Sequence, residues 1–258
     1  SDLPAIWKSA TIIPLPKPGK PPHLSTSFRP ISLLCPASKV LERLLLPFFT
    51  SALTTAPTQH GFTKGRSTTT ALLPAATRVA NGFNERKPPQ RTAAVSIDIS
   101  KAFDVVDHTL LLDAILDSNL LPSLMRWVAT YLRGRQCRVL YQGVSSHWRI
   151  ARTGVPQGSV LGPVLFNFFV ADFPSTASQR DSYADDFNLM ESAVLVPALE
   201  QRLQADIDKA KAWASRKRLD IEPSKCHITL FTPDMARQSN THPRITLPDG
   251  SGNPVVLP

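Results

Sequence analysis

Apolar residues recur every three or four positions between about Pro197 and Lys217, which predicts an amphipathic helix with one buried face. That face consists of Leu199, Leu203, Ile207, Ala210 and Ala214. Similar patterns predict five further helices. The first begins at Ser38 and has an apolar side formed by Val40, Leu41, Leu44, Leu45 and Phe48, and the second is capped by Ser67 and runs to Val79. The others cover His108–Leu120, Ser123–Leu132, which Gly134 ends, and the segment after Gly158 through Val170. Pro47 should kink or end the first of these and Pro74 should interrupt the second, because proline lacks the amide that a helix interior uses.

Short apolar segments with strand character separate these helices. They are Trp7–Leu15, Phe28–Leu34, Thr92–Ile99, a hairpin over Gln136–Arg152 with its turn near Gly143–Ser146, His227–Phe231, and a final hairpin-like segment, Arg244–Pro258. Strands that carry isolated carboxylates and are backed by long helices predict a domain of the α+β class. The polar segment Glu85–Arg91 is predicted as a linker and gives the first domain boundary.

Composition adds an excess of positive charge. Lysine and arginine number 29 against 20 aspartates and glutamates, a net charge of +9 that is spread over the chain without a long basic tail. This favours a groove for a polyanion, although basic surfaces without that role are common. The 3 cysteines, Cys35, Cys137 and Cys226, are scattered without metal-ligand spacing and indicate a reducing compartment. No signal peptide or membrane-spanning run is recognisable, so we expect no membrane partner and an intracellular location, in the nucleus or the cytoplasm.

The segment SYADDFNLM (Ser182–Met190) places two adjacent aspartates, Asp185 and Asp186, among apolar residues. Adjacent carboxylates repel each other and are costly to desolvate. An exposed turn between two strands is one interpretation, and a divalent-metal site is the other. Asp98 ends a buried-type strand. If that strand lies beside the Asp-Asp turn, three carboxylates converge at one edge of a sheet and can hold two magnesium ions for phosphoryl transfer.

The order of motifs along the chain extends this interpretation. SIDISKAFDVVDH (Ser96–His108), GVPQGSVLGPVLFNFF (Gly154–Phe169) and SYADDFNLM follow one another, after FRPISLLCPASKVLERLLL and QHGFTKGRSTTTALL. From about Trp7 to Phe231 the chain resembles the reverse transcriptase of non-LTR (LINE-type) retrotransposons. The resemblance implies an RNA-directed DNA polymerase that extends a DNA primer on an RNA template with dNTPs and two Mg²⁺ ions, for which Mn²⁺ can substitute.

The resemblance also implies roles for residues of the site. Asp98 and Asp185 match the primary metal ligands of the family, and Asp186 matches its supporting second aspartate. Phe103 matches an aromatic gate that collides with a ribose 2′-hydroxyl, with a core phenylalanine as the alternative. Gln157 and Gly158 match the loop that packs against nucleotide and template, where glycine allows the backbone to approach closely.

Basic residues are implied to contact the nucleotide. Arg29 matches the arginine that binds the triphosphate, a role that suits its bidentate guanidinium. Lys17 or Lys20 is the candidate companion, and a solvated loop charge is the alternative for both. Lys225 matches a lysine that protonates the departing pyrophosphate, or is a surface lysine.

Other charged residues receive supporting roles. Asp104 and Asp107 follow the strand of Asp98 and are interpreted as structural or capping residues. Candidates for salt-sensitive, sequence-independent contacts with template and primer phosphates are Lys64, Arg66, Arg133, Arg135, Arg138, Arg149 and Arg152.

The fold implied is that of a right-hand polymerase, with fingers and an antiparallel palm sheet backed by helices. We expect fingers over residues 1–90 and a palm over 91–235, while part of 120–155 could pack with the fingers. Residues 236–258 are expected to be a truncated hairpin leading to a primer grip and a thumb that are absent. The chain would then be part of a longer polyprotein with endonuclease and thumb segments.

The chain departs from the family before Tyr183. Residues Ser178–Asp181 are polar where the family has an apolar strand, which puts the packing of the Asp-Asp turn in question. One alternative function is therefore a truncated or decayed transposon-derived fragment that binds nucleic acid without polymerising. Another two-metal enzyme, such as a nuclease, is the second alternative, and it leaves Phe103 and the loop of Gln157 and Gly158 without a purpose.

Overall fold

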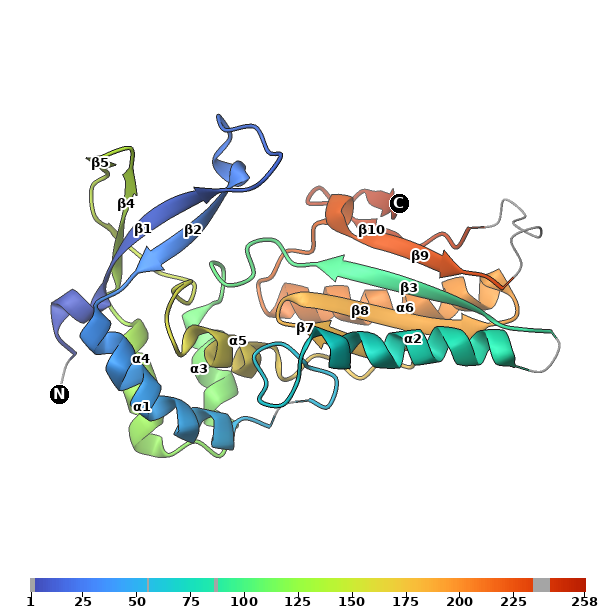
Figure 1. Cartoon of the computed structure of the whole chain (residues 1–258), viewed down its shortest axis with the longest axis horizontal. Helices are drawn as coiled ribbons and strands as arrows, with labels where there is room; N and C mark the ends of the chain where they lie inside the picture. Colours follow the sequence, from blue (N-terminus) through green and yellow to red (C-terminus); the bar gives the residue numbers. More distant parts are fainter. Residues whose placement is uncertain (1–2, 55, 86–87, 234–241) are drawn as a thin grey trace. The chain divides into compact units, whose positions relative to one another are not determined.

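The computed structural model describes residues 3–54, 56–85, 88–233 and 242–258, and its elements fall into two units, each of which the chain enters twice (Figure 1). The first unit is formed by Ser1–Thr54 and Lys101–Ala171, and the second by Thr55–Ser100 and Asp172–Pro258. Both units contain helices and strands, which confirms the predicted mixture of the two. The units are divided at other points than the predicted boundaries after residues 90 and 235, so the division into fingers and palm stays a prediction.

The first unit is built on a mixed sheet. Its strands are β1 (Ser9–Pro16), β2 (Phe28–Leu33), β4 (Gln136–Tyr141), β5 (Val144–Ser145) and β6 (Arg149–Ile150), in the order β2-β1-β4-β5 with β6 also paired to β4. Its helices are α1 (Pro36–Ala52), α3 (His108–Leu116), α4 (Pro122–Leu132) and α5 (Gly162–Val170), with the short 3₁₀ helices η1 (Ala5–Lys8) and η2 (Ser25–Ser27). Because α5, with the sequence GPVLFNFFV, is apolar at nearly every position, almost all of it is buried, and it packs against α3.

Helix α1 differs from the prediction in its length and in its buried face. It continues past Pro47 to Ala52. Pro47 has no amide hydrogen to donate to the carbonyl of Arg43, four residues earlier in the helix. Both residues are exposed, so water can replace the missing hydrogen bond. The predicted apolar side is largely exposed: Val40 is 61%, Leu44 66% and Phe48 51% accessible, and Leu41 and Leu45 are only half-buried. The side buried instead carries Ser38, Glu42, Phe49 and Ala52. The helix is therefore oriented with Glu42 in the interior, although the apolar pattern predicts that another side is buried.

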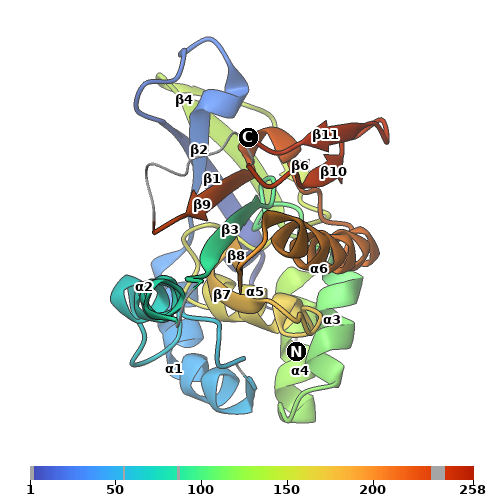
Figure 2. The same cartoon turned by 90° about the vertical axis from the view of Figure 1, so that its right-hand side faces the viewer.

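The second unit is built on an antiparallel sheet with a helix on each face. Its strands β7 (Gln179–Tyr183), β8 (Asp186–Ala193), β3 (Arg91–Asp98) and β9 (His227–Phe231) lie side by side in that order. Figures 1 and 2 show α2 (Thr68–Asn84) on one face of this sheet and α6 (Val196–Arg216) on the other. A 3₁₀ turn, η3 (Pro223–Lys225), precedes β9, and β10 (Thr246–Pro248) pairs with β11 (Pro254–Val256) in the predicted final hairpin.

Alternation along the strands separates the two faces of this sheet. Val95 and Ile97 on β3 lie opposite Leu189 and Phe187 on β8, and all four are buried on the side of α6, where Phe187 contacts Trp213. The predicted buried face of α6 is confirmed at every position. Asp98 and Asp186 lie on the opposite face, at the end of β3 and the beginning of β8.

Helix α2 covers the far end of that opposite face. Ser67 caps it in a capping box with Thr70, as the sequence predicts, but Pro74 does not interrupt it and it continues to Asn84. Arg78 donates through Nε to Ser192 Oγ at 3.2 Å, and Ser192 in turn contacts Thr92 at 2.9 Å. Among the residues that the structure describes, no helix combines the length and the apolar character needed to cross a bilayer.

Candidate active site

The carboxylates of the prediction come together at one corner of the second unit's sheet. Asp98 and Asp186 are direct partners in the pairing of β3 with β8. Partners in an antiparallel pair have Cα atoms about 5 Å apart. Asp185 precedes Asp186 in the turn between β7 and β8. Sequence segments some ninety residues apart therefore deliver three carboxylates to neighbouring positions.

The electrostatics of this corner favour a cation. Burial raises the pKa of Asp185, and the nearby charge of Asp98 raises it further. Burial also raises the pKa of Asp186, followed by repulsion from Asp185 and from Asp98. Asp185 and Asp186 thus keep their protons to higher pH than ordinary aspartates, because burial and then the neighbouring carboxylates disfavour their charged forms.

Lys225 supplies a positive charge beside Asp98. Its Nζ lies 3.6 Å from Asp98 Oδ1, and both side chains are partly exposed. The backbone brings them together, because the amide of Glu222 donates to the carbonyl of Asp98 at 3.2 Å and Ile99 forms a bridge with Ile221. The predicted nucleotide-contacting lysine is thus placed at a carboxylate of the candidate site.

The donor set suits Mg²⁺ or Mn²⁺ in its chemistry, since carboxylate oxygens are the ligands that these hard cations prefer. The side chains are not closed around one point. In the described part of the chain, no three His, Cys, Asp or Glu residues lie close enough together to enclose a metal ion. Asp98, Asp185 and Asp186 would therefore hold cations together with water and substrate oxygens, as magnesium sites commonly do.

The strand that leads to the Asp-Asp turn forms in spite of its polar sequence. Arg180 donates to Thr58 Oγ1 from Nε and Nη2 at 3.0 and 2.8 Å, and its guanidinium lies 4.9 Å from the centre of the Phe173 ring. The amide of Ser178 donates to Asp206 Oδ2 at 2.8 Å. These hydrogen bonds give partners to the Arg180 guanidinium and to the Ser178 amide, so the strand is supported in spite of its polar residues.

In the first unit, the Gln157–Gly158 loop lies against the strand of Arg29. The amide of Ser32, on the same strand β2, donates to the carbonyl of Gln157 at 2.7 Å. Gly158 has a φ of +122°, and a Cβ there would lie 2.7 Å from the Ser32 carbonyl oxygen. Only glycine therefore fits this position, because the Ser32 backbone lies so near, and the close approach to nucleotide and template stays a prediction.

Phe103 belongs to the same part of the first unit. Its ring stacks on Phe166 with centroids 4.5 Å apart, and its carbonyl accepts from Val155 N at 2.8 Å. This packing is what the core interpretation requires, and the gate role stays a prediction. Lys17 closes its own loop through Nζ, which donates to the Thr26 carbonyl at 3.0 Å, whereas Lys20 is exposed.

The supporting charged residues divide into structural and surface groups. Asp107 caps α3 by accepting from two amides, and Asp104 accepts from Gln157 Nε2 at 2.8 Å, both in agreement with structural roles. Burial raises the pKa of Asp104. Arg135 is only 3% exposed and donates to the carbonyl of Tyr131, so its assignment to a phosphate-binding groove was wrong. Lys64, Arg133, Arg149 and Arg152 are exposed, and Arg138 lies over the Trp148 ring.

Comparison with known proteins decides the family. A sequence profile described as "Reverse transcriptase (RNA-dependent DNA polymerase)" matches residues 15–246. The chain belongs to the reverse transcriptase family. It is 34% identical over 244 residues to the "Probable RNA-directed DNA polymerase from transposon BS" of Drosophila melanogaster and 32% identical over 244 residues to the "RNA-directed DNA polymerase from mobile element jockey" of Drosophila funebris. The predicted kinship with non-LTR reverse transcriptases is confirmed.

The matches to the transposon relatives cover most of this chain but only a small part of each relative. Each covers 89% of this chain but 26% of the relative, so the reverse transcriptase chain spans about a quarter of their length. Solved structures share the fold at low identity. Telomerase from Candida tropicalis, in complex with a fragment of telomeric RNA, matches with a TM-score of 0.61 and 12% identity over 94% of this chain and 43% of that one. The apo enzyme truncated from its C-terminal domain matches with a TM-score of 0.58 and 14% identity, over 93% of this chain and 52% of that one.

The sequence analysis of this reverse transcriptase missed residues that support the turn. Gln59 and Thr58 contact the Asp-Asp hairpin, and Asp206 accepts from the backbone that leads into it. The motif QHGFTKGRSTTTALL contains Gln59 and was part of the resemblance, but nothing in its spacing shows a contact with a segment 125 residues further on.

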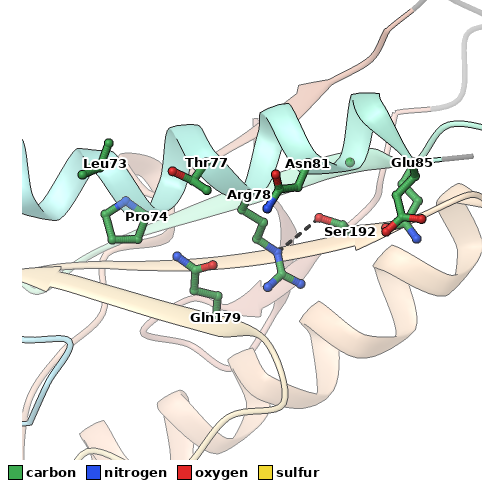
Figure 3. A pocket seen from close by; sticks show the side chains of 10 residues that line it. Leu73, Pro74, Thr77, Arg78, Asn81, Glu85, Gln179 and Ser192 are labelled. Atoms are coloured by element: carbon green, nitrogen blue, oxygen red, sulfur yellow. Dashed lines mark hydrogen bonds between the residues drawn. The ribbon is translucent and has the colours of Figure 1, made fainter.

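A separate hollow of about 630 Å³ lies between α2 and the strands β7 and β8 (Figure 3), and no aspartate of the candidate site lines it. Thr77, Arg78 and Asn81 line it from the helix, and Gln179 and Ser192 line it from the strands. The guanidinium of Arg78 already binds Ser192 and the carboxylate of Glu191. We interpret this hollow as part of the packing of α2.

Proposed function

We propose that this chain is an RNA-directed DNA polymerase domain that extends a DNA primer on an RNA template with dNTPs. The pairing of Asp98 with Asp186, directly beside Asp185, supports this proposal most strongly. Family membership and relatives named as RNA-directed DNA polymerases add to it. We assign fingers to residues 1–90, a palm to 91–235 and a hairpin that leads toward a primer grip to 236–258, within a longer polyprotein.

The residues act by binding and orienting the reactants. Asp98 and Asp185, with Asp186 in support, hold divalent cations. When bound, two Mg²⁺ ions, or Mn²⁺ in their place, neutralise charge at the attacking hydroxyl and at the phosphate. Arg29, with Lys17 as companion, binds the triphosphate, and Gln157 and Gly158 contact the nucleotide.

Two further residues adjust the reaction. Phe103 excludes the ribose 2′-hydroxyl. Lys225 donates a proton to the leaving pyrophosphate once it releases Asp98. Both roles are proposals carried from the family to these positions.

Primer extension tests the function. The full chain is mixed with an RNA template, a DNA primer, dNTPs and Mg²⁺, and product length is measured. Extension is expected with the wild type and with Asp113→Asn, an exposed aspartate on α3, and is expected to be undetectable with Asp185→Asn. Retained extension in Asp185→Asn would refute the site assignment. Phe103→Ala should reduce the preference for dNTPs over ribonucleotides roughly tenfold.

A fragment that binds nucleic acid without polymerising is the second candidate. The contact of Lys225 with Asp98, which places a positive charge at a carboxylate of the candidate metal site, favours it. Filter binding across a salt series separates the two. Salt-sensitive binding with no extension under Mg²⁺ or Mn²⁺ would support the fragment.

A further inference from the structure

The QHGF segment lies along the edge of the second unit's sheet, beside the strand that leads to the Asp-Asp turn. The amide of Ser182 donates to the Thr58 carbonyl at 2.8 Å, and the amide of His60 donates to the Ser182 carbonyl at 2.8 Å. Gln59 and Ser182 form an isolated parallel bridge. The segment therefore extends the sheet locally next to β7, at the point where the turn begins.

The turn itself contains a residue in an unusual conformation. Ala184 has a φ of +58°, a left-handed conformation that residues with a Cβ rarely adopt. It is only 6% exposed, so its amide and carbonyl need protein partners. Asp185 follows directly, and the orientation of the Ala184 peptide decides where the Asp185 carboxylate lies.

The side chain of Gln59 supplies both partners. Its Oε1 accepts from Ala184 N at 3.1 Å, and its Nε2 donates to the Ala184 carbonyl at 3.2 Å. Oε1 also accepts from Gly61 N at 2.9 Å, which fixes the amide group. Gln59 is 5% exposed, and a carboxamide is the side-chain group that can accept and donate at once in this geometry.

Neighbouring residues hold Gln59 in place. A Cβ at Gly61 would collide with the backbone nitrogen of Ala184, so glycine allows the two segments to approach. Arg66 Nη1 donates to the carbonyls of Ala56, Pro57 and Gln59 at 2.9, 2.8 and 2.6 Å. The loop is thus preorganised around the contact.

We propose that Gln59 is a positioning residue for nucleotidyl transfer. It holds Ala184 in the left-handed conformation and thereby places the Asp185 carboxylate relative to Asp98. Gln59 touches no reacting atom, and its effect passes through the turn. The inference rests on the proposed function of the aspartates.

The chain offers a matched control. Gln204 on α6 makes the same pair of bonds to one residue, donating to the Thr246 carbonyl at 3.0 Å and accepting from Thr246 N at 2.9 Å. Gln59→Ala is therefore compared with Gln204→Ala. Gln59→Met keeps the volume and the buried contacts, and serves if the alanine variant fails to fold.

The test measures hydrogen exchange, metal dependence and extension on the full chain. In Gln59→Ala and Gln59→Met, exchange of the amides of residues 184–186 should accelerate at least tenfold. The Mg²⁺ concentration for half-maximal extension should rise severalfold, and the maximal rate should fall about tenfold or more. Gln204→Ala should stay within about twofold of the wild type in all three.

The outcomes distinguish this inference from the proposed function. Unchanged exchange at residues 184–186 in both Gln59 variants would overturn the inference, whether or not the protein polymerises. Slower extension with an unchanged Mg²⁺ concentration for half-maximal extension would also overturn it. If the wild type extends no primer, the proposed function fails, while the exchange comparison still decides whether Gln59 holds the turn.

Discussion

Lys225 Nζ lies 3.6 Å from Asp98 Oδ1 at the corner of the sheet where Asp185 and Asp186 also lie. The lysine belongs to η3 and the aspartate to the end of β3, so a short 3₁₀ turn supplies a positive charge to a cluster of negative ones. A divalent cation bound by Asp98 would compete with this ammonium group.

Removal of Lys225 should strengthen metal binding. In Lys225→Ala, Asp98 loses a competing cation, so the dissociation constant for Mn²⁺, measured by calorimetry on the full chain, should fall by roughly twofold to tenfold. Lys211→Ala removes the same charge from α6 and should leave the constant unchanged. Weaker Mn²⁺ binding in Lys225→Ala would mean that the lysine supports the site instead of competing for it.

Asp185→Asn should stabilise the metal-free protein at neutral pH. Burial, and then Asp98, raise the pKa of Asp185 in the folded state. The folded state therefore holds this proton to higher pH than the unfolded chain does, and stability declines as pH rises from about 3.9 through the raised pKa. At pH 7 without divalent ions, the unfolding midpoint of Asp185→Asn should exceed that of the wild type by a few degrees.

The pH dependence checks the cause of this gain. The difference between Asp185→Asn and the wild type should close as pH falls toward about 4, where both forms are uncharged at this position. Asp113→Asn, with its side chain exposed on α3, should show no such pH-dependent difference. Added Mg²⁺ should raise the midpoint of the wild type and leave that of Asp185→Asn nearly unchanged. A wild type as stable as the variant at pH 7 without metal would contradict the prediction.

Gly158→Ala should destabilise the protein more than Gly143→Ala does. Both glycines have positive φ, +122° and +80°, but a Cβ at Gly158 would meet the Ser32 carbonyl at 2.7 Å, whereas nothing lies within 4 Å of one at Gly143. At Gly143, backbone strain alone should lower the free energy of unfolding by about 1–2 kcal/mol. At Gly158 the collision adds to this strain, and the free energy of unfolding should fall by roughly 2–5 kcal/mol. Denaturant unfolding measures both. Equal losses would show that the loop yields to the added methyl group.

Glu42→Ala should destabilise the first unit strongly. The Glu42 carboxylate is fully buried and accepts from Val160 N at 2.8 Å and Leu161 N at 3.1 Å, at the N-terminus of α5. Loss of these bonds should cost roughly 2–5 kcal/mol of unfolding free energy, because two amides lose their acceptor. Arg43→Ala, at the adjacent exposed position, should cost less than about 0.5 kcal/mol. A small effect at Glu42 would mean that water replaces the carboxylate.

Local patterns were sufficient for many elements. The period of apolar residues determined α6 together with its buried face, and the run of small and β-branched residues determined β3. The ordered motifs were sufficient to predict the family, because they contain the residues of the candidate site and can be identified in the sequence without knowledge of the fold. The predicted metal site required the strand of Asp98 to lie beside the Asp-Asp turn, but the sequence did not predict the register that pairs Asp98 with Asp186.

Tertiary contacts decided the rest. Apolar spacing in α1 favoured the side of Val40, Leu44 and Phe48, but Glu42 is buried on another side, where it accepts from the amides that precede α5. Polarity before Tyr183 put the packing of the Asp-Asp turn in question, but Thr58 and Asp206, from distant parts of the chain, form hydrogen bonds with that strand. Gln59 reaches Ala184 across 125 residues. Periodicity reports only neighbours within a few residues, whereas the burial of a polar group depends on partners that folding brings from distant parts of the chain.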